Sequence, residues 1–166
     1  AVLLFIILNG CSGSSESYND FILDGVAHLN LNKPEKAMQD FSKAINMDPK
    51  QYKGYLGRAN ALNTMRQYDQ AITDYNKVIS INPTIANAYV NRAIAYSNVG
   101  ELKQAIADYE KGLELDPEID DSPSFMKRLF DNVPNEKKGI HTHLELLKKK
   151  SMEKNNKQGA TNSPLP

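Results

Sequence analysis

A unit of 34 residues occurs three times in succession, without insertions, between residues 18 and 119. Three kinds of residue recur at this spacing, namely an alanine, an aromatic residue and a proline: Ala37, Ala71 and Ala105; Phe41, Tyr75 and Tyr109; Pro49, Pro83 and Pro117. A fixed period of this length is typical of stacked helical hairpins that bury their apolar faces against one another. We therefore expect an all-α solenoid with no separate globular domain.

Each copy of the unit predicts two helices. In the second copy, Tyr55, Ala59 and Leu62 fall at i, i+4 and i+7, on one face of a helix. A turn at residues 64–67 follows, and the next helix has an inner face of Tyr68, Ala71, Tyr75 and Val78. Alanines on both helices allow them to approach closely, and the aromatic residue fills the space between hairpins. The closing proline cannot continue the helix, so it ends the copy.

This pattern resembles the tetratricopeptide repeat family. The family's eight signature positions in the third copy are Tyr89, Arg92, Ala93, Tyr96, Ala105, Tyr109, Gly112 and Pro117. Arg92, like Arg58 in the second copy, replaces the usual Leu, and the first copy departs further with Asp24 and His28. The resemblance implies a right-handed superhelix of three hairpins (18–51, 52–85 and 86–119) that acts as a non-catalytic adaptor between proteins.

In this family, the free face of each first helix lines a concave groove. Mapped onto this chain, the groove residues are Asn19, Ile22, Val26, Leu29, Asn30, Lys53, Leu56, Asn60, Asn63, Thr64, Asn87, Val90, Asn91, Ile94, Ser97 and Asn98. The set is rich in amides and contains one lysine and no acid. Because Asn both donates and accepts hydrogen bonds, the groove suits the backbone of an extended peptide. The alternatives are that these residues are merely solvated, or that the convex face or basic tail makes the contact.

The carboxylate clamp of chaperone-binding members of the family is not expected here. Asn60 and Asn91 suit its amide part, but Ile22 and Leu56 stand where the clamp has a Lys, and Val26 where it has an Asn. Without the ammonium groups, charge-assisted hydrogen bonds to a terminal carboxylate are lost. The partner is therefore expected to be a protein segment of another kind.

The amino terminus predicts a lipid anchor. Residues 1–8 are apolar, too few to span a bilayer but suited to the core of a signal peptide. Residues 8–11, Leu-Asn-Gly-Cys, resemble a bacterial lipobox, although Asn9 departs from the usual residue. We therefore expect a signal peptide at 1–10, acylation (palmitate) of Cys11 and a flexible tether at 11–17. The alternatives are part of a transmembrane anchor and a buried amino-terminal helix.

The residue after the cysteine is Ser12 rather than the Asp that marks inner-membrane retention among such lipoproteins. The expected location is therefore the cell envelope, at the outer membrane and facing the periplasm. Lipoproteins of this description take part in pilus or secretion assembly, outer-membrane biogenesis or the regulation of cell-wall enzymes. Two alternatives are a cytoplasmic scaffold and a regulatory accessory subunit of an enzyme.

The segment after the repeats, residues 120–153, predicts helices that cap the last hairpin. Ser122 and Pro123 suggest a helix start, after which Phe125, Leu129, Phe130 and Val133 would cover the third hairpin. A second helix carries Ile140, Leu144 and Leu147 and ends near residue 153, after three lysines at 148–150 that could also contact anionic lipid. Residues 154–166 have little to bury and are expected to be disordered.

Composition and motifs argue against other functions. The chain has 20 basic and 20 acidic residues, so no overall field attracts nucleic acid. With a single Cys, an intramolecular disulfide is impossible. His141 and His143 point apart on a helix, so no metal site is expected. Neither a phosphate-binding loop nor a nucleophile with a matched base is present, and we expect no cofactor and no enzyme activity.

Overall fold

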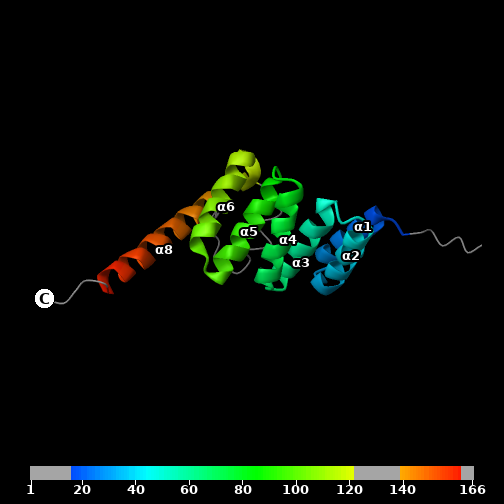
Figure 1. Cartoon of the computed structure of the whole chain (residues 1–166), viewed down its shortest axis with the longest axis horizontal. Helices are drawn as coiled ribbons and strands as arrows, with labels where there is room; N and C mark the ends of the chain where they lie inside the picture. The colour runs from blue at the N-terminus through cyan, green and yellow to red at the C-terminus, as the bar shows by residue number, and fades with distance from the viewer. Residues whose placement is uncertain (1–15, 122–138, 162–166) are drawn as a thin grey trace, which may run out of the picture.

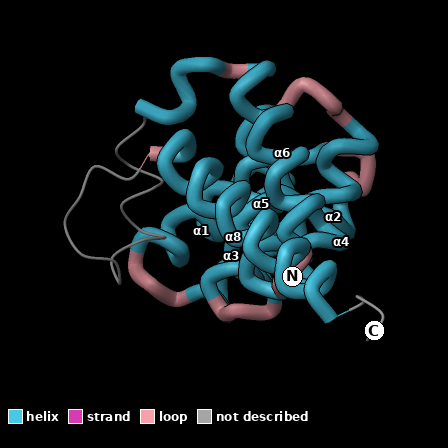
Figure 2. Tube along the Cα trace, turned by 90° about the vertical axis from the view of Figure 1, so that its left-hand side faces the viewer, coloured by secondary structure: helices cyan, strands magenta, loops and turns pink. Residues whose placement is uncertain are grey.

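The computed structural model describes residues 16–121 and 139–161, and these form a row of antiparallel helical hairpins (Figure 1). The hairpins consist of α1 (Tyr18–Asn30) with α2 (Pro34–Met47), α3 (Tyr52–Thr64) with α4 (Tyr68–Ile81), and α5 (Ala86–Val99) with α6 (Leu102–Leu115). A short 3₁₀ helix, η1 (Pro117–Asp121), follows, and α8 (Ile140–Thr161) comes last. The described residues contain helices and loops only (Figure 2), which confirms the predicted all-α solenoid.

Local signals explain where the helices begin. Ser17 caps α1: its side chain accepts from the Asp20 backbone N–H, and the Asp20 carboxylate accepts from the Ser17 backbone N–H at 2.8 Å. This capping box satisfies amide groups that have no partner within the helix. Pro34 starts α2, where its fixed φ is favourable and its missing N–H costs nothing.

The turn inside each hairpin needs a left-handed residue. The equivalent positions of the three repeats are Asn32, Arg66 and Gly100, with φ of 54°, 60° and 85°. Asn and Gly adopt this conformation readily, whereas Arg does so at a cost. The same backbone turn is therefore formed three times from residues of unequal suitability.

The recurring small and aromatic residues form the core, as predicted. Ala37, Ala71 and Ala105 are completely buried, and the aromatics Phe41, Tyr75 and Tyr109 are at most 1% exposed. Each aromatic ring lies between the first helix of its own hairpin and the helix that follows. Burial of these rings joins neighbouring hairpins into one stack.

Helix α8 covers the last hairpin (Figure 1). Its Ile140, Leu144 and Leu147 are buried in one apolar cluster with residues of α5 and α6, which confirms the predicted capping role of this helix. The helix ends at Thr161 rather than near residue 153, so residues 154–161, expected to be disordered, continue it. The additional helix expected from Ser122 lies outside the described residues.

Residues 1–15, which include Cys11, and residues 162–166 also lie outside the described part of the chain. Among the helices that are described, none combines the length and apolar character needed to cross a bilayer.

Ion pairs link the two helices of a hairpin at equivalent positions. Arg58 forms a two-point pair with Asp74 at 2.7 and 2.8 Å, and Arg92 pairs in the same way with Asp108 at 2.7 Å. The first repeat has Asp24 in place of the arginine, and there His28 Nδ1 lies 2.6 Å from Asp40. A recurring acid on the second helix is thus contacted by a basic or imidazole side chain of the first helix in every repeat.

The same two arginines also join successive hairpins. Arg58 Nη1 donates to Ser42 Oγ on α2, and Arg92 Nη1 donates to Asn76 Oδ1 on α4. Each guanidinium therefore holds its own hairpin together and contacts the preceding one. This explains why Arg can replace the usual Leu at this position of the repeat.

Candidate functional site

The expected groove residues on α1, α3 and α5 divide into an accessible group and a buried group. The exposed residues are Asn19, Val26, Asn30, Lys53, Thr64, Asn87 and Asn98, and the half-buried ones are Ile22, Leu29, Leu56, Asn60 and Ser97. The accessible group contains amides, aliphatics and hydroxyls, one lysine and no carboxylate. A surface of this kind is electrically almost neutral.

Four expected groove residues are buried instead. Val90 is completely buried and Ile94 is 4% exposed, and both lie in the apolar cluster with α8. Asn91 and Asn63 are 2% and 7% exposed. The prediction that these four residues line an open surface is therefore wrong. A helical-wheel argument treats the repeats as equivalent, but the third repeat is covered by α8 and the second is packed against the third.

The centre of the array carries a hydrogen-bonded amide cluster, formed by Asn60 of α3, Tyr75 of α4 and Asn91 of α5. Asn60 Oδ1 accepts from the Tyr75 hydroxyl at 2.8 Å and from Asn91 Nδ2 at 2.9 Å. Burial raises the pKa of Tyr75, so its hydroxyl remains protonated and can donate. Both bonds use the oxygen of Asn60, and its Nδ2 has no partner among the described residues.

Two further polar atoms of this region lie buried without a partner among the described residues, namely Asn63 Oδ1 and Asn91 Oδ1. In contrast, Thr64 and Asn98 bond to the carbonyls of Asn60 and Ile94 on their own helices, at 2.9 and 2.8 Å. Among these amides, Asn60 is half-buried, and its Nδ2 is the accessible group that can still donate.

Sequence reasoning missed the part that Tyr75 plays in this cluster. It assigned Tyr75 only to packing between hairpins, because the aromatic position of each repeat serves that purpose. The available signal was that this position is Tyr in the second repeat and Phe41 in the first. A buried Tyr hydroxyl normally needs a polar partner, so Asn60 could have been found from this difference.

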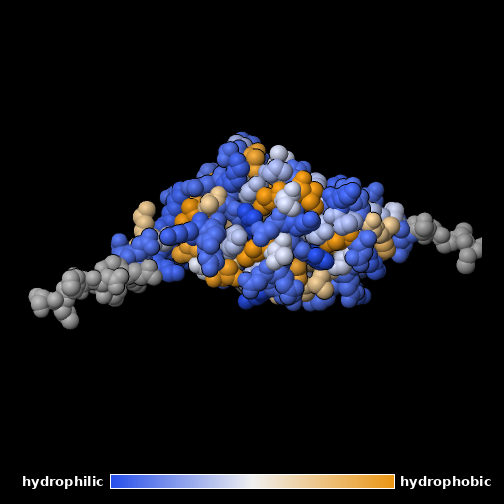
Figure 3. All heavy atoms as spheres, viewed as in Figure 1, coloured by the Kyte–Doolittle hydropathy of each residue, from blue (hydrophilic) through white to orange (hydrophobic). Residues whose placement is uncertain are grey.

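The apolar surface of the array is discontinuous. On the face shown in Figure 3, apolar atoms form separate patches along the hairpins, with polar atoms between them. A partner that follows the array would thus meet apolar and hydrogen-bonding groups in turn.

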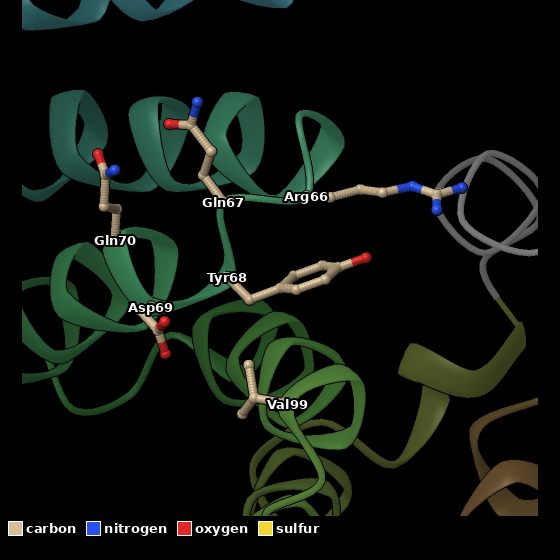
Figure 4. A pocket seen from close by; sticks show the side chains of 6 residues that line it. All are labelled: Arg66, Gln67, Tyr68, Asp69, Gln70 and Val99. Carbon is tan, nitrogen blue, oxygen red and sulfur yellow. The ribbon is translucent and has the colours of Figure 1, made fainter.

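A small hollow of about 170 Å³ lies at the turn between α3 and α4 (Figure 4). It is lined by residues 66–70 and by Val99 at the end of α5, and the Tyr68 ring lies between the side chains of Arg66 and Val99. Sequence reasoning gave no sign of this hollow. It is too small and open to enclose a drug-sized ligand.

His141 and His143 both lie on α8, as the sequence predicts. The His143 ring packs edge-on against Tyr109, with a centroid separation of 5.4 Å. Burial, together with the nearby Lys150, lowers the pKa of His143. Among residues 16–121 and 139–161, no three His, Cys, Asp or Glu side chains converge as they would to hold a metal ion.

Several solved structures are similar to this chain. The first TPR of Spaghetti (RPAP3), bound to HSP90 peptide SRMEEVD, has a TM-score of 0.67 and 20% identity, covering 82% of this chain and 94% of that chain. The Arabidopsis OM64 TPR domain has a TM-score of 0.62 and 25% identity, covering 70% and 97%. For the Sgt2 TPR domain from Aspergillus fumigatus the values are 0.66 and 20%, covering 90% and 86%. These similarities support a shared fold.

None of the curated protein sequences matches the chain closely enough to indicate a relative. Family models described as tetratricopeptide repeat match residues 25–51, 52–85 and 86–119. These three matches are contiguous and follow the repeat spacing, the hairpin architecture and the buried signature residues. The chain therefore belongs to the tetratricopeptide repeat family.

Proposed function

We propose that this protein is a non-catalytic adaptor that binds an extended, largely uncharged segment of a partner protein along α1, α3 and α5. The observation that carries the proposal is the amide cluster of Asn60, Tyr75 and Asn91, in which Asn60 Nδ2 has no partner among the described residues and lies one turn along α3 from Leu56. An amide that can still donate suits a peptide carbonyl, whatever the side chains of the segment.

The lack of charge on the accessible surface decides the kind of segment. The peptide SRMEEVD, bound by one similar domain, contains three acidic residues. In this chain the corresponding surface has Ile22, Val26 and Leu56, and the exposed Lys53 is its single cation. An acidic segment would lose solvation without gaining charged partners, so a neutral segment with apolar side chains is favoured.

A preformed surface also favours binding. The first helices are held by buried aromatic rings and by the arginine pairs with Asp74 and Asp108. A segment that binds along them loses its own conformational freedom, but the array does not have to become ordered as well. The mechanism is therefore passive presentation of a rigid surface.

Photocrosslinking tests this proposal. A benzophenone amino acid at Val26 on α1 should crosslink to a partner recovered from cells, whereas the same group at Thr73, exposed on α4, should not. Replacing Leu56 with Glu should lower the Val26 crosslink about tenfold, because a bound segment would bury an unpaired charge. Equal crosslinking at Val26 and Thr73 would contradict binding along the first helices.

The second part of the proposal is that a lipid on Cys11 holds the adaptor at the cell envelope, at the outer membrane. Its support is the apolar run, the lipobox-like residues 8–11 and the polar tether that follows. Two or more acyl chains would give durable membrane attachment. The processes proposed are pilus or secretion assembly, outer-membrane biogenesis or the regulation of a cell-wall enzyme.

Mass spectrometry of the amino-terminal peptide tests the anchor. Protein extracted with detergent from native membranes should begin at an acylated Cys11. A Cys11→Ser variant should move to the soluble fraction, and a Ser12→Ala variant should remain acylated. An unmodified Cys11 inside a longer peptide would contradict the anchor while leaving the adaptor function open.

A further inference from the structure

Among the described residues, one face of helix α1 carries exposed apolar side chains that no other helix packs against. Leu23 is 67% exposed and Leu31 is 62% exposed, and Ala27 between them is also exposed. These three residues are spaced four apart, so they form one stripe along the helix. Large apolar side chains in such a row indicate a contact surface rather than scattered surface hydrophobes.

At the Ala27 position the equivalent residues of the other repeats are buried, whereas Met65 and Val99, which correspond to Leu31, are half-buried and 39% exposed. Ala61 and Ala95, which correspond to Ala27, are completely buried. A Cβ atom at Gly57, which corresponds to Leu23, would overlap the Phe41 ring of the preceding hairpin. The part of the stripe around Leu23 and Ala27 is thus the face through which the first helix of a hairpin packs against its predecessor.

The stripe is complementary to itself. If two α1 helices pack antiparallel around a two-fold axis at Ala27, Leu23 of each lies opposite Leu31 of the other. The small alanine at the axis allows the helices to approach closely. Such an isologous contact is the usual interface of a homodimer.

Charge favours the same arrangement. Asp20 and Asp24 lie in the first half of α1, whereas Lys33 follows its carboxyl end. Lys33 and Asp24 form no ion pair among the described residues, and Asp20 bonds only to the adjacent Ser17. Antiparallel packing brings the acidic half of each helix near Lys33 of the other, whereas parallel packing would bring like charges together.

We propose that a second copy of this chain covers the α1 stripe and forms an antiparallel, two-fold symmetric dimer through Leu23, Ala27 and Leu31. This contact is separate from the groove and does not depend on the proposed function. A dimer would present two grooves and could bind two segments of one partner assembly.

Sedimentation of the full chain carrying Cys11→Ser, which removes the native thiol, tests the dimer. We expect the dimer to form as the protein concentration is raised to about 100 μM. Ala27→Glu should raise the dissociation constant of the dimer about a hundredfold, because two carboxylates meet at the axis. Met152→Glu is the matched control, since Met152 is 64% exposed at the opposite end. Circular dichroism should show unchanged helix content in both variants.

Crosslinking tests the geometry. In the Cys11→Ser background, Ala27→Cys should crosslink to itself through a short bis-maleimide. Leu23→Cys and Leu31→Cys should crosslink poorly alone and efficiently when the two chains are mixed. A monomer at every concentration, or a dimer unaffected by Ala27→Glu, would overturn the proposal. Efficient Leu23→Cys self-crosslinking would overturn the antiparallel arrangement.

Discussion

The junction between the first two repeats and the junction between the second and third use the same aromatic position in different ways. At the first junction, Phe41 packs against Gly25 of α1 and Gly57 of α3, and a Cβ atom at either glycine would overlap its ring. At the second, Ala59 and Asn91 stand at these positions, and the Tyr75 hydroxyl donates to Asn60. One repeat length thus accommodates an apolar junction and a hydrogen-bonded one.

The difference shows what each junction requires from its neighbours. Phe41 needs only space, and two glycines provide it. Tyr75 needs an acceptor, and Asn60 meets that need while also accepting from Asn91. The first junction has Val26 in place of Asn60, so a Tyr at position 41 would have no equivalent acceptor. Polar function at the groove is therefore tied to the second junction.

Gly57→Ala should produce the largest effect, because its methyl group would overlap the fully buried Phe41 ring. We expect the free energy of unfolding to fall by about 1–3 kcal/mol, as overpacked cores do. In an open helix the same change would stabilise by about 0.5–1 kcal/mol, so the sign of the effect is diagnostic. Urea denaturation followed by circular dichroism measures it.

Phe41→Leu provides the control for this substitution. A smaller side chain leaves room for the new methyl group, so Gly57→Ala should cost less in the Phe41→Leu background than in the native one. A double-mutant cycle gives the coupling between the two positions. Equal costs in both backgrounds would show that Phe41 does not depend on the glycine.

Tyr75→Phe should lower the free energy of unfolding by about 1–2 kcal/mol, since Asn60 Oδ1 loses a donor in a buried cluster. Tyr109→Phe is the matched control at the contact between the third hairpin and α8, where the buried hydroxyl has no partner among the described residues. We expect Tyr109→Phe to be neutral within about 0.5 kcal/mol, or slightly stabilising. Similar losses for both variants would mean that the hydroxyl bond to Asn60 contributes nothing specific.

The hairpin turns extend the comparison between repeats. Arg66 has φ of 60°, at the position where the third repeat has Gly100. Arg66→Gly should raise the free energy of unfolding by up to about 1 kcal/mol by removing a left-handed non-glycine residue. Thermal denaturation would detect this gain, and Asn32→Gly should have a smaller effect because Asn tolerates this conformation. A loss of stability in Arg66→Gly would contradict backbone strain at this turn.

The contact between the third hairpin and α8 should respond to pH through His143, which packs on Tyr109. Burial lowers the pKa of His143 in the folded chain. Below pH about 6.5 the His143 imidazole is therefore protonated in the unfolded chain while it is still neutral in the folded chain. The contribution of α8 packing to the free energy of unfolding should therefore be complete above pH about 6.5. It should decline as the pH falls through the lowered pKa of His143. Urea midpoints at several pH values, compared with those of His143→Phe, isolate this effect. Parallel pH profiles for the native protein and the His143→Phe variant would rule out a pH effect through His143.

Sequence periodicity predicted the helices and most of the core. The repeated Ala and aromatic positions are buried, and the helices of each hairpin lie where the spacing places them. The cap was predicted from Ile140, Leu144 and Leu147, all of which are buried. These features depend on local helical spacing, which a sequence displays directly.

The candidate groove was predicted less well. The face of each first helix was derived from its own residues, and that procedure cannot show what other elements cover. Val90 and Ile94 are covered in the cluster with α8, and Asn91 is turned into the junction with Asn60. The turn at residues 64–67 was predicted, but the left-handed conformation of Arg66 was missed because Arg gives no local sign of it, and the hollow was missed because it depends on packing beside Val99.

By itself, the 34-residue period determined that this chain forms stacked hairpins, because each copy has an apolar face that only a neighbouring copy can bury. Only the tertiary structure decided which polar residues remain accessible and which face of α1 is left without a neighbouring helix in the described part of the chain. Asn60 and Asn91 are joined through space, across 31 residues of chain, and α1 has no predecessor among the described residues. Such relations arise from packing between elements, and residue spacing within one helix does not record them.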